Sequence, residues 1–532
     1  MIFLLPSPLA MPTIQENTKN AFVMKITRLN TENIWIPLAL FGAAFSLNLS
    51  LISKGFYHTD CLGLAIQAQK ILDTAQMHYL HLTGYPLTAL LGALFLKIGP
   101  ALGIANAAFS INMMSVVFSS LSGVLFYFFV KKICDPLTAA LSTGLIITHP
   151  VFLATSVYGN SHMPALFFLM SAFLFLARYR QNGSIAPLVL SAVSLGLMTA
   201  ARPQDIIILP AVAYLFLMKL PVREAPRSQR RRSSGMIKHG IAFLLATIVT
   251  VMLFYLPMLT QNRGPGHVPL SSSIIREVLG DLDTYALWVS FQSVMVSFSP
   301  WAAGLILGGI VLLIKKSRGI LILLILWAAG PLLFFGSLIT TVPRYYINII
   351  LPLAVIVARC VAFLIKKNRR LAILACLCYG ALLVNSLTRV YPVLLFRHQH
   401  DLMKDLGVWV AARSEPTAII FCQDERGIIE YFAKRKTRKP PFMKYASRVY
   451  TRRDAKKLND SRIFIERQLQ QGVPLYATGA ALTSHDPEHR FLKMLKINFG
   501  VEEIGQTVAE EWHQGATNLI LYRERLYRIA PR

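Results

Sequence analysis

The chain has 532 residues, of which 54% are hydrophobic and only 15% are charged, and its mean hydropathy is +0.51. This composition excludes an ordinary soluble globular protein and predicts a polytopic membrane protein. The formal net charge of +28 would suggest a nucleic-acid partner in a soluble chain. Here much of the basic charge lies in short segments between apolar runs, which indicates membrane topology and anionic lipid headgroups, and no nucleic-acid partner is expected.

The first run able to span a bilayer covers residues 34–52 and follows Lys19, Lys25 and Arg28. Basic residues mark the cytoplasmic side, so residues 1–33 are expected inside the cell and the next loop, 53–107, outside. By the usual length criterion about eleven spans are expected in all. The other ten lie near 108–130, 137–155, 160–177, 186–201, 205–220, 240–260, 290–314, 319–338, 345–365 and 371–390.

One apolar run, Pro86 to Ile98, is too short to span, and we expect it to be a helix lying at the membrane interface over Asp60. With this choice the basic clusters all fall on one face of the membrane, at Lys131-Lys132, Arg178/Arg180, Arg223 to Lys238, Lys315 to Arg318 and Lys366 to Arg370. The opposite, external face then carries Asp60, Tyr158–His162, Arg202–Asp205, Gln261–Val289 and Thr340–Arg344.

From Tyr391 onward the chain is rich in charge and contains no spanning run. We expect residues 391–532 to form a small extracytoplasmic α/β domain, after a cytoplasmic segment 1–33 and a transmembrane domain 34–390. Its predicted strands lie near 417–422, 473–477 and 518–523, with helices between them, the first over 425–434.

Asp60 is the first candidate for chemistry, because it stands at the start of a stretch with partly helical apolar spacing. An aspartate in this place either caps the helix or serves as a catalytic carboxylate, and spacing alone leaves both open. His162 lies in the next external loop. It has no His, Cys or Asp partner at ligand spacing, so a polar contact is favoured over a metal ligand or a cap.

Arg202 occupies a very short external turn, and an arginine at membrane depth is costly unless it pairs or binds an anion. A polyprenyl phosphate would place its phosphate there. A salt bridge to Asp205 or snorkelling to the interface explains Arg202 equally well. Arg344 lies at another external boundary, and the tyrosines after it, Tyr345 and Tyr346, match an ordinary interfacial aromatic belt.

The order of these features resembles the GT-C superfamily of membrane glycosyltransferases, especially the branch with protein O-mannosyltransferases and lipid A aminoarabinose transferases. The resemblance covers approximately residues 34–390. It rests on Asp60, Ala65, Ala68, Ile71-Leu72, Tyr85-Pro86-Leu87, Lys131-Lys132, Ala201-Arg202-Pro203, Arg344-Tyr345 and Pro352.

The resemblance implies a GT-C-like helical membrane fold and an inverting transfer of a sugar from a polyprenyl-phosphate-linked donor. It implies Asp60 as general base, Arg202 and Arg344 as ligands of the donor phosphate, and His162, Tyr85 and Tyr345 as substrate contacts. The acceptor would be a protein, lipid or glycan, with the bilayer as the second partner.

The chain departs from the family's pattern where a second carboxylate would stand, because it has Cys61 beside Asp60 and Asn160, Ser161 and His162 in the later loop. No metal ligand is therefore assigned, although a divalent cation, Mg²⁺ or Mn²⁺, stays open as a cofactor. The alternatives to an enzyme are a transporter or flippase of lipid-linked substrates and a non-catalytic envelope-assembly protein. A bacterial inner membrane is the expected location.

Overall fold

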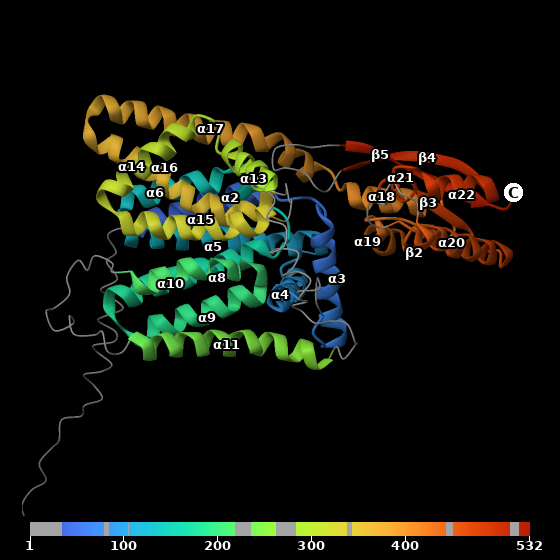
Figure 1. The fold of residues 1–532 in the computed structure, drawn as a ribbon, viewed down its shortest axis with the longest axis horizontal. Coiled ribbons are helices and arrows are strands. Elements are labelled where there is room, and N and C mark those ends of the chain that lie inside the picture. Colours follow the sequence, from blue (N-terminus) through green and yellow to red (C-terminus); the bar gives the residue numbers. More distant parts are fainter. Residues whose placement is uncertain are drawn as a thin grey trace, which may run out of the picture.

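The computed structural model describes residues 34–78, 84–104, 106–218, 236–261, 284–337, 343–442, 451–510 and 521–532. The expected cytoplasmic segment 1–33 therefore lies outside the described residues, as do most of the basic stretch 223–238 and of the external loop 261–289. The described part is a helical bundle followed by a small mixed sheet with its own helices (Figure 1).

The bundle is built from helices whose positions follow the predicted spans. Their bounds are α2 Trp35–Ser50, α5 Ala107–Ile133, α6 Pro136–Thr148, α7 Pro150–Ser156, α8 His162–Asn182, α9 Ile185–Ala201, α10 Leu209–Leu217, α11 Met236–Gln261, α13 Thr284–Ser297, α14 Ala302–Lys316, α15 Arg318–Ser337, α16 Ile347–Lys367 and α17 Arg369–Gln399. Two short 3₁₀ helices, η2 Pro203–Ile208 and η4 Pro343–Tyr346, precede α10 and α16.

Six helices in the described ranges are long and apolar enough to cross a membrane, or up to eight if each bent pair is one span. The bent pairs are α6 with α7, which meet at 64°, and α13 with α14, which meet at 101°. The first bend falls at His149-Pro150, where Pro150 cannot continue the ladder of α6 and His149 caps α7 instead. Since α2, α9 and η2 with α10 are apolar but shorter, the number of eleven spans stays a prediction.

Two helices cross one end of the bundle instead of running along it (Figure 1). They are α3, Thr59–Thr74, and α4, Pro86–Ala101, which contains the short apolar run predicted to lie at the interface. They pack on each other closely at Gly92, where an added Cβ would lie 3.2 Å from Ala68 and from Leu64. The end of the bundle covered by α3 and α4 carries the candidate site.

Contacts among the predicted basic clusters show that several of them gather away from α3. Lys132 donates to Gln181 at the end of α8, and Asp135 accepts from both Arg359 and Lys366 at 2.6 and 2.9 Å. These contacts join the ends of α5, α8 and α16, as expected if one face of the membrane carries the positive charge.

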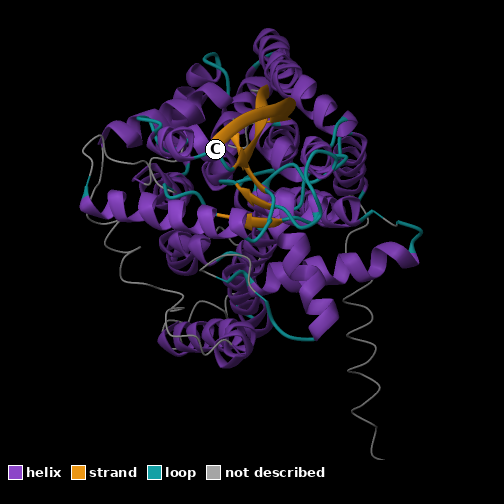
Figure 2. Ribbon diagram, turned by 90° about the vertical axis from the view of Figure 1, so that its right-hand side faces the viewer, coloured by secondary structure: helices purple, strands orange, loops and turns teal. Residues whose placement is uncertain are grey.

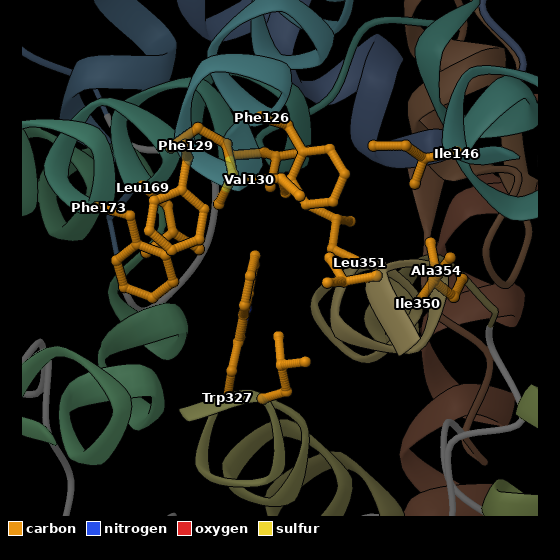
Figure 3. Close-up of a cluster of buried hydrophobic side chains, with 14 of the residues drawn as sticks. Phe126, Phe129, Val130, Ile146, Leu169, Phe173, Trp327, Ile350, Leu351 and Ala354 are labelled. Atoms are coloured by element: carbon orange, nitrogen blue, oxygen red, sulfur yellow. The ribbon is translucent and has the colours of Figure 1, made fainter. Parts of the chain in front are cut away.

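The centre of the bundle is an aromatic cluster around Trp327, which is fully buried on α15 (Figure 3). Its ring makes edge contacts with Phe126, Phe129 and Phe173, at centroid separations of 6.4, 6.1 and 4.9 Å. Edge-to-face packing of this kind adds stabilisation to simple burial. It fixes α5, α8 and α15 relative to one another.

The chain after the bundle folds into a five-stranded mixed sheet of order β2-β1-β3-β5-β4, seen in front of the helices in Figure 2. Strands β1 (Ile419–Phe421), β2 (Lys436–Arg438) and β3 (Leu475–Thr478) are parallel, whereas β4 (Gly500–Glu510) and β5 (Leu521–Ala530) are antiparallel additions. The accompanying helices are α18 Leu402–Ala411, α19 Arg426–Ile428 with a π turn to Ala433, α20 Arg452–Gln470, α21 Gly479–Thr483 and α22 Arg490–Asn498.

One hydrophobic core continues from the first external loop into this sheet. It includes Leu62 and Ala65 of α3, Leu406 of α18, Ile428 of α19 and Ile420 of β1. The C-terminal sheet is therefore packed onto the helix that begins with the candidate carboxylate.

Candidate active site

Asp60 lies in the first turn of α3, but it is not the capping residue. The N-cap is His58, whose extended backbone (φ −132°, ψ 150°) precedes the helix and whose Nδ1 accepts the Asp60 N–H at 3.1 Å. The Asp60 carboxylate instead faces Arg344, with Nη2 to Oδ2 at 3.1 Å, and keeps 31% of its side chain exposed. The cap interpretation is thus not supported, because the partly exposed carboxylate forms an ion pair instead.

His58 also brings Nδ1 within 3.3 Å of Asp60 Oδ2. The same nitrogen cannot accept the backbone N–H and donate to the carboxylate in one protonation state. The capping geometry requires neutral His58 with the proton on Nε2, and the cation in direct contact with the Asp60 carboxylate is Arg344.

Tyr345 is the centre of the site, because three predicted site residues surround its ring. The guanidinium carbons of Arg202 and Arg344 lie 5.1 and 5.3 Å from its centroid, and the His162 ring lies 5.6 Å away. The ring is held by stacking on Phe335 at 4.9 Å. Cation–π contacts of this kind let one apolar ring bring two like charges together.

Arg202 is 3% exposed and is anchored on two sides. Its Nε donates to Asp205 at 3.1 Å, and its Nη1 lies 3.1 Å from His162 Nε2 and 3.4 Å from Ser161 Oγ. Since arginine only donates, His162 Nε2 accepts and the ring proton lies on Nδ1. The salt bridge considered for Arg202 does form, and it coexists with the contact to His162.

Tyr85 joins the first external loop to the Arg202 turn. It adopts a left-handed backbone (φ +52°), and its hydroxyl accepts from Gln204 at 2.6 Å. One turn later Thr88 donates to the Ala201 carbonyl at 2.8 Å. Asp60, Arg202, Arg344, His162, Tyr85 and Tyr345 are therefore all brought to the α3 end of the bundle.

Two asparagines near these residues have no role in the sequence-based interpretation. Asn160 precedes the N-cap of α8, Ser161, and its Oδ1 accepts the N–H groups of His162 and Met163 at 2.9 and 3.2 Å. Asn112 is fully buried on α5 and contacts both external loops. A buried amide within a spanning apolar run is costly, and that cost is the signal that could have singled out Asn112.

Comparison with known proteins identifies the family of this chain. Residues 52–415 match the family described as oligosaccharyl transferase STT3, N-terminal. The chain belongs to this family. It is a membrane glycosyltransferase of the GT-C type, which confirms the resemblance, the enzyme class and the helical membrane fold expected from the sequence.

Several solved structures have a fold similar to that of this STT3-family chain. ArnT from Cupriavidus metallidurans bound to undecaprenyl phosphate has a TM-score of 0.57 and 10% identity, over 94% of this chain and 98% of that one. AglB, the oligosaccharyltransferase of Archaeoglobus fulgidus in complex with an inhibitory peptide and a dolichol-phosphate, has a TM-score of 0.53 and 13% identity, over 92% and 74%.

The arabinofuranosyltransferase AftD from Mycobacteria has a TM-score of 0.50 and 13% identity; the match covers 94% of this chain but only 40% of AftD. No curated protein matches the sequence. At these identities the structural likeness shows the shared fold.

The residues of this STT3-family site do not fit a divalent cation. No group of three or more His, Cys, Asp or Glu that could hold a metal gathers in the described part of the chain. Asp205 is bound by Arg202, and the Asn160 amide oxygen accepts two backbone N–H groups. We derive no chemical step through a metal ion.

Proposed function

We propose that this chain transfers a sugar from a polyprenyl-phosphate-linked donor to an extracytoplasmic acceptor, with inversion at the anomeric carbon. The observation that carries the proposal is the direct contact of Asp60 with Arg344, one tyrosine ring away from Arg202. ArnT and AglB, which share the fold, were solved with undecaprenyl phosphate and dolichol-phosphate, and a donor of that class would meet two guanidinium groups here.

Arg344 has two roles in this proposal. Without donor, Arg344 pairs with Asp60 and neutralises it. The donor phosphate competes for the same guanidinium, because phosphate and carboxylate accept the same forked donors. Binding of the donor would therefore release the Asp60 carboxylate as a base at the moment when a sugar is present.

The reaction then proceeds in one displacement. The acceptor hydroxyl gives its proton to Asp60 while its oxygen forms a bond to the anomeric carbon, and the bond from that carbon to the phosphate oxygen breaks on the opposite face. The polyprenyl phosphate leaves with the bonding electrons. Arg202 and Arg344 stabilise the charge that develops on it.

The remaining site residues orient the substrates. His162 accepts from Arg202 and presents its Nδ1–H, while the Tyr345 ring contacts both guanidinium groups. Tyr85 is held by Gln204 beside the Arg202 turn. We assign His162, Tyr85 and Tyr345 as sugar or acceptor contacts.

Asp60→Asn tests the proposal directly. Transfer from a radiolabelled polyprenyl-phosphate sugar should fall by about 10²–10⁴-fold, the usual contribution of a general base, while the protein still inserts and stays folded. Asp73→Asn is the matched control, because Asp73 lies on the same helix, is exposed and accepts a hydrogen bond from Gln69. Transfer by Asp60→Asn at the control's rate would remove Asp60 from the mechanism.

A transporter or flippase of the same lipid is the competing function. It would move the labelled lipid between leaflets without breaking the sugar–phosphate bond. Reconstituted protein that translocates the donor but yields no glycosylated product would favour transport, and a protein that does neither would favour an envelope-assembly role.

A further inference from the structure

We propose that Asn112 is a positioning residue that fixes the two external loops of the site relative to each other. This inference deepens the proposed function and rests on it for its effect on catalysis. Asn112 lies on α5, touches none of the six assigned site residues in the contacts described, and is 0% exposed.

The Asn112 amide uses every hydrogen-bonding position it has. Its Nδ2 donates to the carbonyls of Ser53 and Gly55, at 2.9 and 3.1 Å, in the segment that leads to Asp60. Its Oδ1 accepts the N–H of Gly159 at 2.8 Å and the Cys61 thiol at 3.4 Å. An asparagine has two donors and two acceptor lone pairs, so no other common side chain of this size satisfies all four groups.

Asn112 therefore joins two loops that are 100 residues apart in the chain. On one side it contacts the segment before Asp60 and the residue after it, Cys61. On the other side it contacts Gly159, three residues before His162. The approach is close because residue 159 has no side chain: an added Cβ would overlap the Ile111 side chain and lie 3.1 Å from Cys61 Sγ.

The same face of α5 carries two further polar contacts at helical spacing. Ser115 Oγ accepts the Asn160 N–H at 3.2 Å, and Ser119 Oγ accepts from Asn48 of α2 at 3.0 Å. Residues spaced three and four apart share one helix face. Of this row, Asn112 and Ser115 hold the loops, whereas Ser119 holds only a neighbouring helix and serves as a control.

Removal of the amide should loosen the loops without unfolding the chain. Asn112→Leu leaves the Ser53 and Gly55 carbonyls and the Gly159 N–H without this partner, and buried polar groups left this way are costly. Cys61 reports the change, because its thiol bonds to Asn112 and is 0% exposed. Burial also raises the pKa of that thiol, which suppresses its reaction in the intact loop.

The experiment measures alkylation of each cysteine in the full-length protein by a maleimide, with peptide mapping by mass spectrometry. In Asn112→Leu the rate at Cys61 should rise at least about tenfold, while Cys422, buried in the C-terminal sheet, serves as the reference and stays unchanged. Ser119→Ala should change neither. An unchanged Cys61, or an equal rise at Cys422 from general unfolding, would overturn the inference.

A second variant covers the case in which Asn112→Leu does not accumulate. Asn112→Asp keeps Oδ1 for Gly159 and Cys61 but places an oxygen where Nδ2 donates to the carbonyls of Ser53 and Gly55, so a rise at Cys61 of at least about threefold is expected. An unchanged alkylation rate at Cys61 in a folded Asn112→Asp variant would count against the positioning role of Asn112.

The kinetic arm separates this inference from the proposed function. In either variant kcat for sugar transfer should fall at least tenfold, whereas the donor KM should change by less than threefold, because Asp205 anchors Arg202 independently of Asn112. A raised donor KM with unchanged kcat would contradict a positioning role. If the wild-type chain transfers no sugar, the proposed function fails, and the Cys61 labelling still decides the role of Asn112.

Discussion

Arg202 shows how a single residue can carry both a structural and a functional interpretation. Its salt bridge to Asp205 is buried on both sides, with side chains 4% and 6% exposed. Breaking a buried pair by removing one partner costs about 3–5 kcal/mol, because the other charge stays uncompensated. The simple variant Arg202→Ala would therefore confuse lost folding with lost donor binding.

The double variant Arg202→Ala/Asp205→Asn removes both charges and gives a cleaner test. We expect the apparent donor KM to rise by about 10–100-fold, since a hydrogen bond to a charged group contributes about 1.5–3 kcal/mol. The measurement is transfer rate against donor concentration, with Asp205→Asn alone as control. An unchanged donor KM in the double variant would remove Arg202 from phosphate binding.

A second residue-scale prediction concerns Glu425 and Glu524, which are buried together in the C-terminal sheet. Desolvation, and next the charge of Glu524, raises the pKa of Glu425 well above its usual value. Desolvation also raises the pKa of Glu524, which accepts the N–H groups of Ala480 and Arg525. We infer that the two carboxyl groups share one proton, which Glu425 carries.

The sign of the pH effect follows from these raised pKa values. An acid whose folded pKa exceeds its unfolded value contributes stability that is complete below the unfolded value, near 4.5, and is lost as the pH rises through the folded pKa. The free energy of unfolding of the C-terminal region should therefore fall as the pH rises above about 5, by at most about 1.4 kcal/mol per pH unit for each proton released. Thermal unfolding should show this as a falling Tm.

Glu425→Gln supplies a permanent donor to Glu524 and should flatten this pH dependence. Glu502→Gln, at an exposed carboxylate on β4, is the control and should leave the slope unchanged. A wild-type Tm that does not fall with rising pH, or a Glu425→Gln slope equal to the wild type, would contradict the shared proton.

At the scale of elements, the packing of α4 on α3 decides whether Asp60 stands at the site. Gly92 of α4 approaches Ala68 and Leu64 of α3 so closely that a leucine side chain cannot fit without moving one helix. We expect Gly92→Leu to lower transfer at least tenfold and to lower thermal stability by about 1–3 kcal/mol.

Gly42→Leu on α2 is the matched control for this change, because an added Cβ there has nothing within 4 Å. It should leave both transfer and stability close to those of the wild type. Full activity of Gly92→Leu would show that the contact between α3 and α4 does not position the carboxylate.

Elements with a strong apolar signal could be predicted from the sequence, and weaker ones could not. Each predicted span falls on a helix or on two successive helices, because 137–155, 205–220 and 290–314 are each divided in two. Strands β1 and β3 lie where buried apolar runs indicated strands. Strand β2 lies within the basic tract after Lys434, and β4 has acidic and amide residues among its apolar ones. Neither has a sequence pattern distinct from a loop, and both form because β1 and β5 offer an edge.

Site residues, too, could be predicted from the sequence only where they give a strong signal. Asp60, Arg202 and Arg344 could be singled out because charge at the end of an apolar run is costly and visible. Their mutual contacts could not be predicted, since Asp60 and Arg344 lie 284 residues apart and meet only through the fold. Asn112 gives a weaker signal than these charges, because one uncharged amide hardly changes the mean hydropathy of α5 and only its expected burial marks it.

At the scale of the whole molecule, the prediction concerns orientation in the membrane. The ends of α5, α8 and α16 carry basic clusters, and the other end carries α3, so we propose that the α3 end and the C-terminal sheet face away from the cytosol. In a cysteine-free background, a membrane-impermeant thiol reagent applied to intact cells should label Asp73→Cys and Glu502→Cys. It should not label Arg370→Cys until the cells are opened.

Labelling of Arg370→Cys in intact cells, with protection of Asp73→Cys, would invert this topology and exclude an extracytoplasmic acceptor. We propose a bacterial inner membrane as the location. Separation of inner and outer membranes after labelling should then recover the labelled protein in the inner-membrane fraction.

The core shared by α3 and the C-terminal sheet has a consequence for engineering. Gly427 lies against Leu62, and Ile428 and Leu406 close over the same side of α3. Truncation of the chain after residue 390 would remove the residues that pack on one side of α3, the helix that carries Asp60. The apolar side chains on that side would then be exposed to water. The charge-rich C-terminal quarter of this protein is thus part of the same folded unit as α3, and any minimal catalyst made from the chain has to keep both parts.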